Sequence, residues 1–81
     1  MNIIEAIQQA ENGKLITNNF LKMSNRFLEY RGEGRFFEHE ISGLISRYNR
    51  EVINFSTAEI LSTGWEIVNI NKVHINKEKL K

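Results

Sequence analysis

The 81-residue chain contains no cysteine, 41% of its residues are hydrophobic, and its formal net charge is +1. A chain of this length forms one domain, and the lack of cysteine excludes disulfides, thiolate zinc sites and thiol catalysis. No apolar run approaches the roughly 20 residues that cross a bilayer, and the N-terminus lacks the basic start of a signal peptide. We therefore expect one cytoplasmic domain over residues 1–70, without a membrane partner, and a charged tail over residues 71–81.

The N-terminal residues predict a helix. Apolar side chains recur there at helical spacing, at Ile3, Ile4, Ile7 and Ala10. Asn2 and Glu5 match a capping box at its start, and Gly13 is a natural stop. Residues 14–17 predict a short strand, and the polar residues 18–25 predict a connecting segment rich in turn formers.

The next segment predicts a meander of antiparallel strands, because runs of strand-forming residues alternate with turn formers. Four short strands are expected, over residues 26–31, 35–41, 44–48 and 51–55. The turns between them are predicted at Gly32-Glu33-Gly34, Ser42-Gly43 and Asn49-Arg50.

A second, short helix is predicted next, since Ser56 and Glu59 match another capping box and Gly64 can end the helix. Residues 65–70, with apolar side chains on both faces, predict a last strand near the middle of the sheet or covered on both sides. The expected fold class is α+β, with an N-terminal helix, an antiparallel sheet of about five to six short strands and a short second helix before the last strand.

Motifs that support catalysis are missing from the sequence. His39 and His74 lie on different elements without metal-binding spacing, and His39 is expected at the surface of a strand. No Walker A, G-x-G-x-x-G or G-x-S-x-G motif is present. We expect no enzyme, no cofactor and no metal site. The net charge of +1 does not indicate binding to a long nucleic acid.

Two regions of the sequence could hold an anion. All five arginines fall in the predicted meander, interleaved with aromatic residues: Arg26, Arg31, Arg35, Arg47 and Arg50. Such side chains bind phosphates and stack on bases, although ion pairs with Glu29, Glu33, Glu38 and Glu40 at a solvated surface are the favoured interpretation. The other region is the start of the second helix, where Ser56 and Thr57 would hold an anion or simply cap the helix.

Two motifs resemble a known family. The first is Glu5-Ala6 with Gly13-Lys14-Leu15-Ile16-Thr17, and the second is Phe55–Val68, FSTAEILSTGWEIV. Together they look like the Thoeris anti-defence type-two family of small phage domains, one related branch of which is anti-CRISPR, and the resemblance covers Ile3 to Val68. It implies a homo-oligomer, dimer or tetramer, in the infected bacterial cytoplasm. Such a protein sequesters a cyclic ADP-ribose-type signal or a cyclic dinucleotide without cleaving it.

The resemblance also suggests where a ligand would bind. After the first strand the family usually has a basic residue and a tryptophan, where this chain has Asn18-Asn19-Phe20. The expected ligand-binding residues are Asn18, Asn19, Phe20, Arg26, Arg47, Tyr48, Ser56 and Thr57. The aromatic residues would stack on bases, and the arginines and helix start would hold phosphates. The alternative is a protein–protein inhibitor of a bacterial defence system on the same scaffold, and a virion or replication accessory module is a third possibility.

Overall fold

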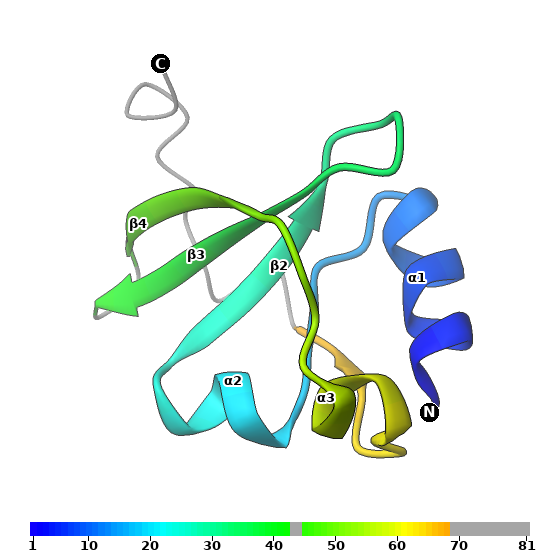
Figure 1. The fold of residues 1–81 in the computed structure, drawn as a ribbon. Helices are drawn as coiled ribbons and strands as arrows, with labels where there is room; N and C mark the ends of the chain where they lie inside the picture. Colours follow the sequence, from blue (N-terminus) through cyan, green and yellow to red (C-terminus); the bar gives the residue numbers. More distant parts are fainter. Residues whose placement is uncertain (43–44, 69–81) are drawn as a thin grey trace.

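The chain has an α+β fold, seen in a computed structural model that describes residues 1–42 and 45–68, with the backbone alone for 41–42 and 45–49. The described elements are α1 (Ile3–Glu11), β1 (Ile16–Thr17), α2 (Asn19–Met23), β2 (Arg26–Tyr30), β3 (Phe36–Ser42), β4 (Ile45–Val52), α3 (Thr57–Leu61) and β5 (Glu66–Ile67). The strands form one antiparallel five-stranded sheet in the order β4-β3-β2-β1-β5 (Figure 1). The fold class therefore matches the prediction, with a helix at the N-terminus and a short helix before the last strand. The proposed tail, residues 71–81, lies outside the described residues.

The first helix forms where its sequence pattern predicts. Asn2 Oδ1 accepts a hydrogen bond from the Glu5 backbone at 2.9 Å, and Glu5 Oε1 accepts one from the Asn2 backbone at 3.0 Å. These bonds satisfy backbone donors that the first turn of a helix leaves unpaired. Gly13 follows with a φ of +91°, a left-handed conformation that glycine adopts easily. Ala6 and Ala10 are buried against the sheet.

Strand register decides which side chains face the helices. Leu28 pairs with Ile16 on one side and with Glu38 on the other, and Glu38 pairs with Arg50. Paired residues share a face of a sheet, so these four side chains lie on the helix face of this sheet. The core forms on that face from Ala6, Ala10, Ile16, Leu21, Leu28, Phe36 and Trp65.

The segment predicted as a connecting loop contains a helix. α2 begins after Asn18, whose side chain accepts a hydrogen bond from the Leu21 backbone at 2.8 Å. It ends at Met23, with Ser24 as its C-cap, and the following Asn25 has a φ of +56°. Only Leu21 among its residues is buried, so the helix has too short an apolar pattern to be recognised from periodicity.

One long strand replaces two predicted strands. β4 continues through Asn49 and Arg50, which pair with His39 and Glu38, so the turn predicted at these two residues is wrong. The backbone hydrogen bonds to β3 override the local turn preference of asparagine. The irregularity in this ladder lies between Glu40 and Ile41 of β3. Gly43, expected in the preceding turn, lies outside the described residues.

The last strand is shorter than predicted. β5 is at the end of the order of described strands, and Glu66 and Ile67 are exposed. The expected place in the middle of the sheet, or covered on both sides, is therefore wrong for these residues, and residues 69–70 lie outside the described part. Trp65 packs into the core just before β5 instead of starting it.

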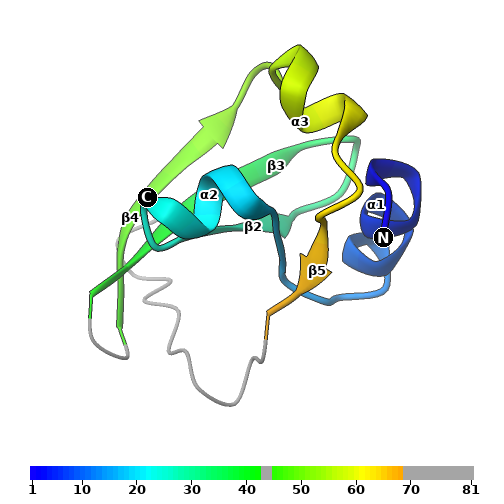
Figure 2. The ribbon, with the colours of Figure 1, turned by 90° about the horizontal axis from the view of Figure 1, so that it is seen from below.

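Met1, which precedes α1, is hydrogen-bonded to the backbone of the segment that precedes β5. The Trp65 backbone N–H donates to Met1 O at 3.1 Å, and the Met1 amino group donates to Thr63 O and Trp65 O. β5 consequently lies beside α1 (Figures 1 and 2). Within residues 1–42 and 45–68, no helix has the length and apolar character needed to span a membrane.

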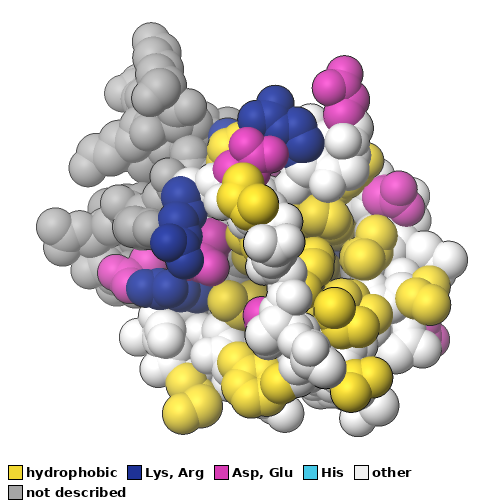
Figure 3. Space-filling view, in the orientation of Figure 1, with side chains coloured by type: hydrophobic (Ala, Val, Ile, Leu, Met, Phe, Trp, Pro, Cys, Tyr) yellow, Lys and Arg dark blue, Asp and Glu magenta, His cyan; other side chains and the backbone are white. Residues whose placement is uncertain are grey.

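Several large apolar side chains remain exposed on the shorter helices. Phe20 and Met23 of α2 are 49% and 85% exposed, and Ile60 and Leu61 of α3 are 49% and 75% exposed. Figure 3 shows hydrophobic surface over the lower edge of the molecule, where Figure 1 places α2 and α3. These four residues are called the α2–α3 apolar surface below.

Candidate functional site

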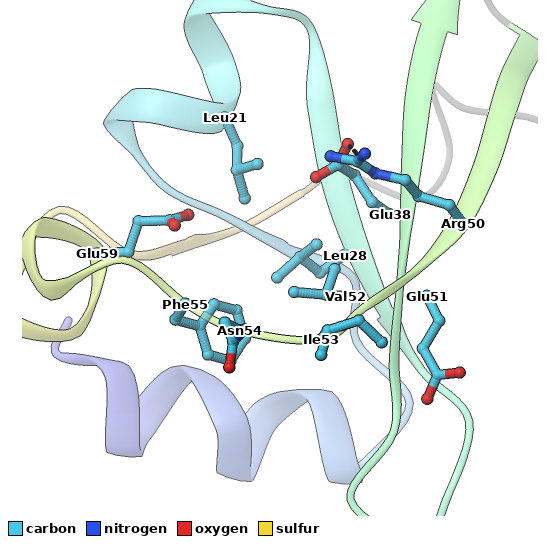
Figure 4. Close-up of a pocket in the computed structure, with 10 residues that line it drawn as sticks. All are labelled: Leu21, Leu28, Glu38, Arg50, Glu51, Val52, Ile53, Asn54, Phe55 and Glu59. Carbon is cyan, nitrogen blue, oxygen red and sulfur yellow. Dashed lines mark ion pairs between the residues drawn. The ribbon is translucent and has the colours of Figure 1, made fainter.

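A pocket of about 360 Å³ opens between α2, α3 and the helix face of the sheet. The segment that connects β4 to α3 forms one of its walls (Figure 4). We call it the helix-side pocket. Its described lining residues are Leu21, Leu28, Glu38, Arg50, Glu51, Val52, Ile53, Asn54, Phe55 and Glu59.

Apolar side chains form the floor of the helix-side pocket. Leu21 enters from α2, and Leu28 and Val52 project from β2 and β4 (Figure 4). Phe55 packs against Trp65 in a T-shaped arrangement, with ring centroids 5.9 Å apart, so that the floor is continuous with the core. A flat aromatic or heterocyclic group would bury apolar area on such a floor.

The sheet end of the pocket carries balanced charges. Glu38, whose side chain is 8% exposed, lies 3.1 Å from Arg26 Nη1 and 3.6 Å from Arg50 Nε. Two guanidinium groups therefore compensate this largely buried carboxylate. The Arg50 side chain is 58% exposed and reaches over Glu38 towards the pocket (Figure 4). This end could receive an anionic group beside Arg50.

The α3 end of the pocket carries a carboxylate with neutral partners. Glu59 Oε1 accepts hydrogen bonds from the Ser56 backbone and hydroxyl, both at 3.1 Å. Glu59 Oε2 accepts one from Asn18 Nδ2 at 3.2 Å. No lysine or arginine in the described part of the chain forms an ion pair with Glu59. Its carboxylate is directed into the pocket (Figure 4).

Glu51 belongs to the pocket wall only through its position in β4. Its side chain is directed away from the pocket (Figure 4), and both of its carboxylate oxygens accept hydrogen bonds from Arg35 at 2.9 Å. This hydrogen bonding holds the pKa of Glu51 below its ordinary value and raises the pKa of Arg35. The charge of Glu51 is therefore already paired on the other side of the sheet.

None of the eight sequence-predicted residues is among the described lining residues of the helix-side pocket. Three contact it indirectly, since Asn18 and Ser56 hold Glu59 and Arg26 holds Glu38. Asn19 and Phe20 are exposed on α2. The Asn19 side chain packs against Gly64, since a Cβ added at Gly64 would lie 2.5 Å from Asn19 Nδ2. The side chains of Arg47 and Tyr48 lie outside the described part of the structure.

The start of α3 is occupied by its own capping box. The Ser56 hydroxyl accepts a hydrogen bond from the Glu59 backbone at 3.2 Å, while its backbone N–H donates to the Glu59 carboxylate. Thr57 follows as the first residue of this five-residue helix and is exposed. A phosphate placed at Ser56 would have to share it with the carboxylate of Glu59, which favours capping as the role of this residue.

Sequence reasoning missed the three charged residues that define the pocket: Glu38, Arg50 and Glu59. Glu59 was recognised, but only as a cap. Glu38 and Arg50 were considered as members of surface ion pairs; they do pair, but the Glu38 side chain is largely buried. Their meeting depends on the register of β3 and β4, which the predicted turn at Asn49-Arg50 would have prevented.

A second pocket, of about 400 Å³, lies beside β1, β2 and β5, and we call it the edge pocket. Lys22 and Glu66 form an ion pair of 2.9 Å within its lining, and Arg26 also contributes. Arg26 is thus the sequence-predicted site residue that lines a described pocket. The other described lining residues are Thr17, Asn25, Phe27, Ile67 and Val68.

The face of the sheet opposite the helices holds a histidine–carboxylate pair. His39 is fully buried, which contradicts its expected surface position, and its ring stacks on Phe27 with centroids 5.1 Å apart. His39 Nε2 lies 3.0 Å from Glu29 Oε1, and Arg31 Nη2 lies 3.0 Å from the same oxygen. The hydrogen bond with His39, with a further contribution from Arg31, outweighs burial and lowers the pKa of Glu29 to about 2.

Neither a metal-binding cluster among the described residues nor a similar protein gives further information on the site. Across the residues whose positions are described, no three His, Asp or Glu side chains gather closely enough to hold a metal ion. No family model, curated protein or solved structure matches the chain.

Proposed function

We propose that this chain is a phage counter-defence protein that binds a cyclic nucleotide immune signal and sequesters it without cleavage. The ligand would be a cyclic ADP-ribose-type molecule or a cyclic dinucleotide. The observation that supports it is the order of groups in the helix-side pocket: an apolar floor with Arg50 at one end and Glu59 at the other. A nucleotide offers the matching groups, because its base has an apolar face and an N–H edge and its phosphate is anionic.

The size of the pocket favours a shared site. Ligand pockets usually enclose about 300–1,000 Å³, and this one, at about 360 Å³, is at the small end of that range. It would hold one nucleotide unit of a cyclic dinucleotide and leave the second unit outside. We therefore propose a homo-oligomer, a dimer or tetramer, in which another copy encloses the remainder of the ligand.

The chemistry of the pocket supports binding without turnover. Its described lining offers no hydroxyl, thiol, amine or imidazole side chain as a nucleophile. The Glu38 and Glu59 carboxylates are already engaged by arginines and by a capping box. Groups held in this way suit recognition better than proton transfer.

Calorimetry and native mass spectrometry test this function. The wild-type chain is titrated with cyclic ADP-ribose isomers and cyclic dinucleotides, and bound ligand is recovered after denaturation. We expect intact ligand, and a loss of roughly tenfold or more in affinity for Arg50→Gln, since a charge-assisted contact contributes about 1.5–3 kcal/mol. Arg35→Gln is the matched control, because Arg35 does not line the pocket and pairs with Glu51, whose side chain is directed away from it (Figure 4). Absence of binding to every nucleotide, or recovery of cleaved products, would contradict the proposal.

The α2–α3 apolar surface favours a second candidate, a protein–protein inhibitor of a bacterial defence system. Exposed Met23 and Leu61 are typical of side chains that a protein partner buries. This alternative predicts a stoichiometric complex with a purified defence protein that the double change Met23→Ser and Leu61→Ser weakens. It also predicts that no signalling nucleotide raises the melting temperature. A nucleotide-dependent stabilisation would favour the first proposal.

A further inference from the structure

We infer that Glu59 is the residue that selects the base of the ligand: it binds an exocyclic amine and thereby orients the phosphate towards Arg50. The inference rests on the proposed function and names the ligand class of the same pocket. It concerns a cyclic nucleotide whose base carries an amine, as adenine and guanine do.

The hydrogen bonds of Glu59 leave room for one more donor. A carboxylate offers about four acceptor positions and, when ionised, no donor. Three positions are used: two at Oε1 by Ser56 and one at Oε2 by Asn18. The remaining position at Oε2 belongs to the oxygen that faces away from Ser56, and the carboxylate is directed into the pocket (Figure 4). A ligand group there must therefore donate a hydrogen bond.

The two carboxylates of the pocket differ in charge compensation. Glu38 has two arginines within 3.6 Å, whereas the described partners of Glu59 are an amide, a hydroxyl and a backbone N–H. The negative charge of Glu59 repels a phosphate and attracts a polarised N–H group. Since Arg50 is at the other end, the ligand has one favoured orientation, with its base over Leu21 and Leu28.

Glu59 is held in place before any ligand arrives. Asn18 is fully buried, and it fixes Glu59 while it caps α2. The indole N–H of Trp65 donates to the Glu59 carbonyl at 2.9 Å and fixes the backbone of the same residue. A carboxylate held by such supports discriminates strongly, because it cannot move away to avoid a ligand without a donor.

The test compares ligand pairs that differ only in the amine. Cyclic di-AMP and cyclic di-GMP are each titrated beside the analogue in which hydrogen replaces the exocyclic amine, and the ratio of the two dissociation constants is measured. We expect the wild type to prefer the amine-bearing ligand by roughly 10- to 100-fold, the range of one hydrogen bond to a charged group. In Glu59→Gln the ratio should fall by about tenfold, because the charge is lost while the capping box is retained.

Glu5→Gln is the matched control, because Glu5 has the same place in the capping box of α1 and is exposed outside the pocket. Thermal unfolding should show a similar small change for both variants, and only Glu59→Gln should change the ratio. Binding of both ligands of a pair with equal affinity, or an unchanged ratio in Glu59→Gln, would overturn the inference while nucleotide binding stands. No binding of any nucleotide to the wild type would remove the proposed function itself.

Discussion

The helices α1 and α3 begin with the same device but are attached to the domain differently. Each starts with a capping box, formed by Asn2 and Glu5 in α1 and by Ser56 and Glu59 in α3. α1 places Ala6 and Ala10 in the core, whereas none of the residues of α3 is buried. Burial fixes the first helix, and hydrogen bonds from neighbouring side chains fix the second.

This difference explains why a pocket forms beside α3. A helix that buries its side chains closes the space next to it, because protein interiors pack densely. α3 leaves that space open and is held by the Trp65 indole and the Asn18 amide. The carboxylate at the third position of its capping box thereby becomes a wall of the pocket, while the equivalent Glu5 remains a surface residue.

The largest expected effect comes from removing the indole that holds α3. Trp65→Ala should lower the free energy of unfolding by about 3–5 kcal/mol, the usual cost of deleting a buried tryptophan. In the native state the Ile60 amide, bonded to Ser56 O in α3, should then exchange its hydrogen faster than the Ala6 amide, bonded to Asn2 O in α1. Urea denaturation and amide exchange measure both effects. Equal acceleration in the two helices would show that α3 does not depend on Trp65 in particular.

Enlarging one alanine in each helix tests burial directly. Ala6 is fully buried and Ala58 is exposed. Ala6→Leu should destabilise the domain by about 1–3 kcal/mol through overpacking. Ala58→Leu should stay within about 0.5 kcal/mol of the wild type, as surface changes do. Thermal denaturation of the two variants measures both changes. Similar losses of stability would contradict the contrast between the helices.

The two asparagine residues that cap α2 and α1 should contribute differently to stability. Asn18 is buried and serves both α2 and Glu59, whereas Asn2 is exposed and serves α1 alone. Asn18→Ala should cost about 2 kcal/mol, because the Leu21 N–H loses its partner in a buried place. Asn2→Ala should cost about 0.5 kcal/mol, since water replaces the cap. Denaturant titration measures both, and a smaller cost at Asn18 would argue against its role in attaching α3.

The loss of stability at acidic pH should not depend on either helix, because the titrating residue, Glu29, lies on the opposite face of the sheet. Its pKa falls from 4.5 to about 2 on folding, chiefly through the hydrogen bond with His39. The ionised carboxylate therefore stabilises the fold fully above about pH 5, and this contribution is lost as the pH falls towards 2. We expect a loss of about 1 kcal/mol after solvent screening of this partly buried group.

Unfolding curves at intervals between pH 5 and pH 2.5 measure this loss. Glu29→Gln is the control, since it removes the titrating group, and its stability should fall less steeply than that of the wild type by the same amount. Parallel pH profiles for the two proteins would mean that Glu29 does not gain its stabilising interactions on folding.

The elements predicted correctly are those whose signals are local. α1 combines apolar spacing with a capping box, and α3 has a capping box of its own, so both were recognisable. α2 was missed because its one buried residue, Leu21, gives no periodicity. β4 was divided in two because Asn49 favours turns, and only pairing with β3 shows that the chain stays extended.

The candidate site was less predictable because its residues come from separate elements. The side chains of Leu21, Glu38 and Glu59 belong to α2, β3 and α3, and they meet only when the sheet register is known. The arginines proved easier, since several pair with the expected carboxylates: Arg26 with Glu38 and Glu40, Arg31 with Glu29, and Arg50 with Glu38. The expected solvated surface is wrong for Glu38, whose side chain is largely buried. Arg35 pairs with Glu51, which the sequence did not suggest.

The indole that fixes α3 also makes the protein its own optical reporter. Trp65 is the single tryptophan of the chain and is 2% exposed. Its ring contacts Phe55, which lines the helix-side pocket, and its N–H is bonded to Glu59. A ligand that settles against Phe55 alters the surroundings of the indole, and detachment of α3 brings water to it. Tryptophan emission from the unlabelled protein can therefore follow pocket occupancy and helix release in one cuvette.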